Sequence, residues 1–142
     1  MALYRSLEAL YSFRAASRLA LKLNLVTDWN ELAATLEDEL GWWPREEASL
    51  VALFQTADKA DLERVLNSFD PGIVGPDTNV PSTAAKRVYK LRNSLVHHRP
   101  AHQLDNPEPN EWSGLCVGMA GILFNVYDAV NAAQNLDSSA TQ

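Results

Sequence analysis

The chain has 142 residues, of which 46% are hydrophobic and 21% are charged. This length suits one domain with a core of its own, and the composition excludes a disordered tail, a collagen and a coiled-coil rod. A formal net charge of −6, from 12 basic and 18 acidic residues, argues against a protein that coats nucleic acid through bulk charge.

Cysteine usage and hydropathy favour a reducing, cytoplasmic location. The single cysteine, Cys116, excludes an intrachain disulfide and a cysteine-based zinc site. Arg5 and Glu8 interrupt the N-terminus before an apolar segment develops, so no signal peptide is expected. The longest apolar stretch, residues 115–126, is too short to span a bilayer, and we expect no membrane association.

Apolar residues recur every three or four positions along most of the chain, which predicts helices. The first helix is expected over residues 3–23, with about six turns. Asp28 followed by Glu31 is a capping-box pattern that predicts a second helix over residues 29–40, ended by Gly41.

The middle of the chain contains two further helical segments and a loop. Residues 45–69 have helical periodicity, and we expect a break near Asp58. Residues 70–81 are rich in proline and glycine, which predicts a loop. Ser82 is a good N-cap for the next helix, which is expected to run to about His97.

The chain is expected to end in a second loop, over residues 101–109, and a last helix over residues 110–135. The sequence thus predicts an all-α fold, an up-and-down bundle of four to five helices in one domain over residues 1–136, with a polar, frayed C-terminus over residues 137–142. Without strands, there is no setting for a Rossmann, P-loop or nucleophile-elbow site. The expected core includes Leu7, Leu10, Leu53, Leu66, Val88, Leu95, Leu123 and Tyr127.

One segment departs from the acidic character of the chain. Residues 86–99 contain five basic residues and no acidic residue, and all three histidines lie in or just after it; the residues are Lys86, Arg87, Lys90, Arg92, Arg99, His97, His98 and His102. On a helix, Asn93 and His97 lie about 40° apart, and the long side chain of Arg92, about 140° from His97, can reach the same exposed wedge of surface. These three groups suit phosphodiester cleavage without a metal. The imidazole can relay protons, the guanidinium can hold a phosphate, and the amide can orient the imidazole or the phosphate.

The pattern Arg92-Asn93-x-x-x-His97 resembles the R-x(4–6)-H motif of the HEPN superfamily, in which a polar residue follows the arginine. HEPN domains are helical bundles of about this length, and the helical order of the whole chain is similar to theirs. The resemblance implies a metal-independent endoribonuclease that needs no cofactor. It also implies a homodimer in which two motifs meet across the twofold axis to form one cleft.

The resemblance implies a role for each motif residue. His97 would be the general base or acid when the ribose 2′-hydroxyl attacks phosphorus, and Arg92 would stabilise the charged pentacovalent state. Asn93 would position His97 or the phosphate. One toxin subgroup has a tyrosine two positions after the motif histidine; position 99 is arginine here, which puts regulation through such a tyrosine in doubt.

Three interpretations of the function stay open. HEPN proteins are often toxins, some restrained by an antitoxin, or antiviral-defence effectors; others are catalytically silent partners of nucleotidyltransferases. A silent HEPN module that binds a partner protein or a nucleotide is therefore the first alternative to an RNA-cleaving enzyme. A plain helical scaffold is the second, because a cation at a helix end also interacts favourably with the helix dipole.

Further residues are candidates for RNA binding or for packing. The RNA-binding candidates are Lys86, Lys90, Arg99, His98, His102, Arg14 and Arg18. With Lys22, the last two form a stripe at positions i, i+4 and i+8, which phosphate contacts or ion pairs with the acidic residues 37–39 would explain equally well. The spacing of the histidines does not make a regular set of metal ligands.

Two motifs are more typical of packing than of binding. The Trp42-Trp43 pair could stack on bases, but an aromatic pair at a helix end is more often part of a core or a dimer interface. Gly114, Gly118 and Gly121 leave one face of the last helix nearly bare, which predicts close packing against a neighbouring helix.

Overall fold

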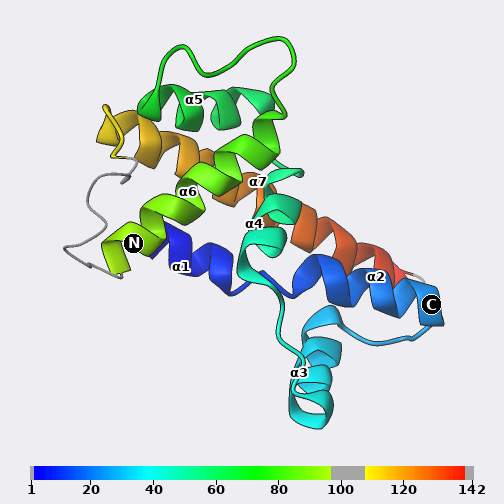
Figure 1. Ribbon diagram of the computed structural model, residues 1–142. Coiled ribbons are helices and arrows are strands. Elements are labelled where there is room, and N and C mark those ends of the chain that lie inside the picture. Colours follow the sequence, from blue (N-terminus) through cyan, green and yellow to red (C-terminus); the bar gives the residue numbers. More distant parts are fainter. Residues whose placement is uncertain (1, 97–107, 140–142) are drawn as a thin grey trace.

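The computed structural model describes residues 2–96 and 108–139, and it contains helices and no strand over these ranges (Figure 1). The all-α class is therefore confirmed for the described residues. The helices are α1 (Ala2–Glu8), α2 (Phe13–Leu23), α3 (Trp29–Leu40), α4 (Glu46–Phe54), α5 (Lys59–Phe69), α6 (Val80–Val96) and α7 (Trp112–Ser139). Helix α7 runs past residue 136, so the first part of the expected polar tail is helical.

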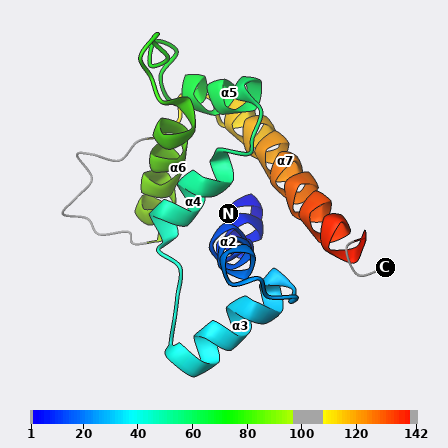
Figure 2. The ribbon, with the colours of Figure 1, turned by 90° about the vertical axis from the view of Figure 1, so that its right-hand side faces the viewer.

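The buried residues of the core come from all of the helices except α3, and Trp29 of α3 packs against this core. Helix α5 packs along α7, and α6 packs against both α4 and α5. Helix α1, at the N-terminus, packs against both α4 and α7 (Figures 1 and 2). Helix α3 packs mainly against α2 and projects from the rest of the molecule, with Ala33 as its one buried residue (Figure 2).

The N-terminal region differs from the expectation of one helix over residues 3–23. It forms two helices, because a pair of tight turns interrupts the chain: the amide of Leu10 donates to the carbonyl of Leu7, and the amide of Phe13 donates to that of Leu10 (both 3.0 Å). Leu10, Tyr11 and Phe13 are all buried. Successive residues of a regular α-helix point 100° apart, so a break allows these three side chains to enter the same core.

Helix α3 begins and ends where predicted, although Glu31 does not complete the predicted capping box. The Asp28 carboxylate accepts a hydrogen bond from the amide of Asn30 at 2.7 Å, which satisfies one free N–H of the first turn. Glu31, the other member of the capping-box pattern, accepts from the Thr27 hydroxyl at 3.2 Å. Gly41 ends the helix in the left-handed conformation, with φ of 61°.

The predicted break between α4 and α5 is confirmed, whereas the predicted start of α6 is corrected. The break between α4 and α5 falls before Lys59, as the pattern near Asp58 predicted. Helix α6 begins at Val80, two residues before the predicted cap. The side chain of Asn79 accepts from the amide of Ser82 at 3.2 Å, so Asn79 takes the role expected of Ser82.

Most of the predicted core is confirmed. Leu7, Leu10, Leu53, Leu66 and Val88 are buried, and Leu123 is partly buried against the same cluster.

The predictions for Leu95 and Tyr127 are wrong, since these residues are 50% and 40% exposed. Helix α7 turns Ile122 and Val126 into the core, which leaves the neighbouring Tyr127 about 100° away from it. Leu95 lies in the last turn of α6, at the wall of a cavity.

The small-residue face of α7 packs against α5, as the spacing of the glycines predicted. A Cβ atom on Gly118 would lie 2.8 Å from Cγ2 of Val65 and 3.0 Å from the carbonyl oxygen of Asp61. A Cβ atom on Gly114 would lie 2.8 Å from the Ser68 hydroxyl. The absence of side chains thus lets the two helix backbones approach closely.

Helix α7 is also long and apolar enough, over Trp112–Asn135, to cross a membrane by length and composition. The expectation that the longest apolar stretch, residues 115–126, is too short to span a bilayer is therefore wrong about the length of the apolar helix. The core helix of a soluble protein passes the same test, and α7 packs one side against α5.

We expect Gly118→Ala to lower the free energy of unfolding by about 1–3 kcal/mol, because the new methyl group meets the backbone of α5, which cannot move aside locally. Gly121→Ala is the matched control: its methyl group meets the carboxylate of Asp61, the far end of a flexible side chain, and alanine gains about 1 kcal/mol of helix propensity. Urea denaturation of both variants measures the difference. Equal stability of the two variants would contradict this account of the α5–α7 contact.

Candidate functional site

Arg92 joins three helices near the C-terminal end of α6. Its Nη2 atom donates to Oε1 of Glu8 at 3.0 Å, and its Nη1 atom lies 3.9 Å from Oε2 of Glu46. Nη1 also donates to Oδ1 of Asn93 at 3.1 Å, and the guanidinium lies 5.7 Å from the centre of the Tyr4 ring. The side chain of Arg92 is only 20% exposed, so the expectation of an exposed wedge is wrong for this residue.

The local sequence explains why Arg92 lies at the border of the core. Val88 and Leu91 are buried on one face of α6, and Arg92 follows at the edge of that face. Glu8 is the last residue of α1, and Glu46 is the first residue of α4. An acidic residue in the first turn of a helix interacts favourably with the helix dipole, so Glu46 is compatible with its helix as well as with Arg92.

The electrostatics keep Arg92 charged. Burial lowers the pKa of Arg92, but the carboxylates of Glu46 and Glu8 outweigh this effect, so that the pKa is raised above its ordinary value. Below Arg92, the Tyr11 hydroxyl donates to the Tyr4 hydroxyl at 2.8 Å. Burial raises the pKa of both tyrosines, so these hydroxyls stay neutral and act as hydrogen-bonding groups.

A cavity of about 90 Å³ adjoins Arg92 between α1, α6 and α7. Its walls are mainly apolar, with Leu3, Leu95 and Trp112 among them, and Arg92 provides the charged part of the wall. Trp112 is 51% exposed at the start of α7. The guanidinium is therefore held from one side by carboxylates and borders an open space on another.

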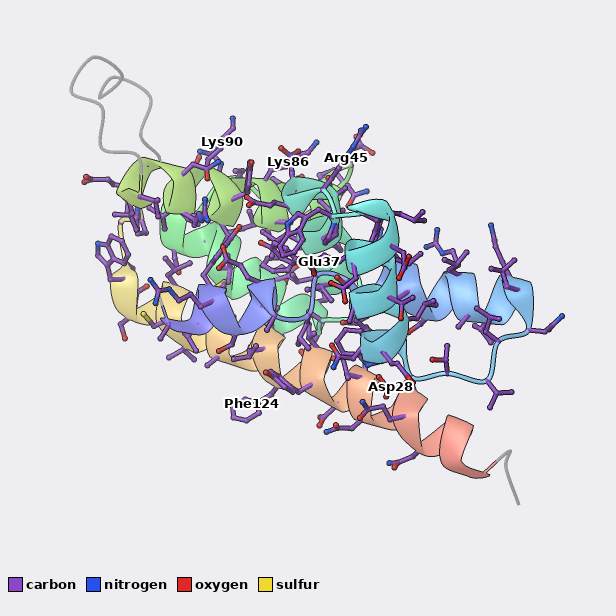
Figure 3. All side chains as sticks on the ribbon, turned by 90° about the horizontal axis from the view of Figure 1, so that it is seen from below. Asp28, Glu37, Arg45, Lys86, Lys90 and Phe124 are labelled. Atoms are coloured by element: carbon purple, nitrogen blue, oxygen red, sulfur yellow. The ribbon has the colours of Figure 1, made fainter. Side chains whose placement is uncertain are left out.

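The structure brings together only part of the predicted site. Arg92 and Asn93 are in contact, whereas Lys86 and Lys90 are exposed on a face of α6 that Arg92 does not share (Figure 3). Arg14 and Arg18 are exposed on α2, away from Arg92. The remaining candidates lie outside the described residues: His97, His98, Arg99 and His102.

The described residues exclude one alternative for each of two motifs. The ion pairs there involve Lys59 with Glu63, and Arg92 with Glu8 and Glu46, so the cationic stripe of α2 does not pair with the acidic residues 37–39. Trp43 is 65% exposed, so the interpretation of the tryptophan pair as part of a core is wrong for this residue.

Sequence reasoning missed Glu8, Glu46 and Tyr4 as partners of Arg92. Glu8 is 84 positions from Arg92, and no motif connects the two. Glu46 is the first residue of α4, where an acidic residue is expected in any helix, so its position did not single it out as a partner of Arg92. Only the packing of α1 and α4 against the rest of the bundle brings the three charges together.

In comparisons with protein-family models, with curated proteins and with solved structures, nothing matched this chain.

Proposed function

We propose that the chain is a metal-independent endoribonuclease of HEPN type that acts as a homodimer, as a toxin or an antiviral-defence effector. The observation that carries the proposal is the contact between Arg92 and Asn93 at the end of α6, beside an open cavity. This pair is the described part of the motif that resembles HEPN ribonucleases. His97, the third member, follows in the sequence.

The orientation of Arg92 suits the binding of a phosphate. A guanidinium has five N–H groups, and Arg92 uses two of them in hydrogen bonds with Glu8 and Asn93 among the described residues. Glu46, at 3.9 Å, is too far for a hydrogen bond and is the partner that an incoming phosphate would displace. Glu8 would hold the guanidinium in place while the other N–H groups stabilise the charge that develops on the phosphate.

In the proposed reaction, His97 removes the proton of the ribose 2′-hydroxyl, and the 2′-oxygen attacks the adjacent phosphorus. The bond from phosphorus to the 5′-oxygen of the next nucleotide breaks, and that oxygen takes up a proton from the imidazolium of His97. The products are a 2′,3′-cyclic phosphate on the upstream fragment and a 5′-hydroxyl on the downstream fragment. The Asn93 amide positions the imidazole or the phosphate.

A silent HEPN module is the second candidate, and a specific observation favours it. Two carboxylates lie beside Arg92, and an ion pair of this kind also serves to join helices without any ligand. In that function the chain binds a partner protein, such as a nucleotidyltransferase, or a nucleotide, and it does not cleave RNA. The two candidates therefore differ in one measurable property.

The test is incubation of the purified chain with RNA in an excess of EDTA. We expect cleavage that leaves 2′,3′-cyclic phosphate ends, and we expect DNA of the same sequence to remain intact because it lacks the 2′-hydroxyl. End-labelled fragments and mass spectrometry of the products identify the termini. Cleavage that needs a divalent metal, or equal cleavage of DNA, would overturn the proposal, and a complete lack of cleavage would favour the silent module.

The homodimer is supported by the outer face of α7. Val117, Phe124 and Tyr127 are 51%, 73% and 40% exposed and lie along one side of the helix, and Phe124 points away from the other helices (Figure 3). Exposed apolar patches of this kind mark interaction sites. Cys116 is exposed and also lines the cavity beside Arg92, so a second copy on this face would lie next to the site.

We expect Phe124→Glu to convert a dimer into a monomer in sedimentation-velocity experiments at micromolar concentration, because the charge cannot be buried in an apolar interface without a partner. Val26→Glu is the control, since Val26 is 93% exposed in the turn between α2 and α3 and has no place in the proposed interface. A wild-type chain that is monomeric at these concentrations would contradict the homodimer.

A further inference from the structure

The exposed face of α6 carries two lysines that form no ion pair among the described residues. Lys86 and Lys90 are exposed and lie four residues apart, which places them about 6 Å apart along the helix axis and on the same face. Neither is among the ion pairs of the described residues. Helix α6 itself contains no acidic residue, so nothing on this helix offsets their charge.

Arg45 extends the lysine face onto a second helix. It precedes α4, which packs against α6, and its side chain is exposed and free of ion pairs within the described part of the chain. Figure 3 shows Lys90, Lys86 and Arg45 pointing outward along the same edge of the molecule. We call these three residues the cationic edge.

The cationic edge lies beside the candidate site around α6. Residues of an α-helix are 100° apart, so Lys86, Lys90 and Asn93 lie within about 60° of one another around α6. Asn93 contacts Arg92 at 3.1 Å. Tyr89, which is partly buried against the core and partly exposed, lies about 60° from Lys86, between the lysines and Arg92.

We propose that the cationic edge and Tyr89 bind a single-stranded segment of RNA next to the scissile phosphate. This inference rests on the proposed function, because it takes RNA as the ligand. Lys86, Lys90 and Arg45 contact phosphates of one strand, and Tyr89 stacks on an unpaired base, as aromatic residues do in proteins that bind single strands. A duplex presents no free base face to Tyr89, so the site prefers single-stranded RNA.

The test measures RNA binding as a function of salt, by fluorescence anisotropy, with His97→Ala as the parent chain so that the RNA stays intact. For single strands, each phosphate contact contributes about −0.7 to the slope of log K against log salt concentration. The three contacts of the cationic edge contribute about −2 to the slope, to which the phosphate contact of Arg92 adds, and Lys86→Ala with Lys90→Ala should reduce its magnitude by about 1.4. Lys59→Ala with Arg64→Ala removes two exposed cations of α5, which has no part in the proposed site, and should leave the slope unchanged.

A second comparison tests the aromatic contact. Tyr89→Leu should weaken the binding of single-stranded RNA by about 5- to 100-fold, whereas Tyr89→Phe, which keeps the ring, should retain most of the affinity. Duplex RNA of the same sequence should bind more weakly than the single strand and should respond little to either substitution.

The outcomes separate this inference from the proposed function. An equal effect of the two double variants on the slope, or no RNA binding by the parent chain, would overturn the cationic edge as an RNA site. If the wild-type chain cleaves RNA in either case, the nuclease proposal stands without it. If the slope depends on Lys86 and Lys90 but the wild-type chain cleaves no RNA, the binding surface stands and the nuclease proposal fails.

Discussion

Replacing His97 by alanine is expected to lower the rate of RNA cleavage by about 10²–10⁴-fold, which is the usual contribution of a general acid or base. The imidazole is the one group of the motif that can exchange a proton near neutral pH, and no lysine or arginine nearby can take over this role. Single-turnover cleavage in EDTA, at saturating RNA, measures the chemical step apart from binding.

The neighbouring histidine His102 provides the control. His102→Ala removes an imidazole from the same part of the sequence and should change the rate much less than His97→Ala. Circular dichroism should show the same helix content for both variants. A His97→Ala chain that cleaves as fast as the wild type would mean that the motif is the end of a helix and not an active site.

Arg92→Ala is expected to have two effects, because Arg92 belongs to both the candidate site and the fold. Cleavage should fall by an amount comparable to that of His97→Ala, since the charged pentacovalent state loses its guanidinium. The free energy of unfolding should also fall by about 1–2 kcal/mol, because a hydrogen bond to a charged group is lost and Glu8 is left without its partner. Single-turnover kinetics and urea denaturation measure the two effects separately.

Glu8→Gln separates the structural role of Arg92 from the catalytic one. This variant weakens the ion pair but leaves the guanidinium in place, so it should lower the stability while most of the cleavage activity remains. If Arg92→Ala and Glu8→Gln lower the activity only in proportion to the unfolded fraction, Arg92 is a purely structural residue. The silent module instead predicts an inactive wild type, with a loss of stability in both variants.

Local signals in the sequence determined the elements that depend on neighbouring residues. The cap at Asp28, the left-handed Gly41 and the break before Lys59 need only a few adjacent residues, and each formed as predicted. The spacing of Gly114, Gly118 and Gly121 likewise predicted a close helix contact, although the partner helix α5 could not be named from the pattern.

The tertiary structure decided the features that depend on residues far apart in the chain. The chain is interrupted between α1 and α2, because the break allows Leu10, Tyr11 and Phe13 to be buried together in a core formed with the other helices.

The sequence alone predicted an all-α chain and singled out Arg92 and Asn93, because helical periodicity and a short motif are properties of neighbouring residues. It could not show that Arg92 is partly buried between Glu8 and Glu46, nor that the face of α6 with Lys86 and Lys90 is exposed. The reason is physical: a helix specifies which residues share a face, but only packing against other helices decides which face is buried and which charges meet.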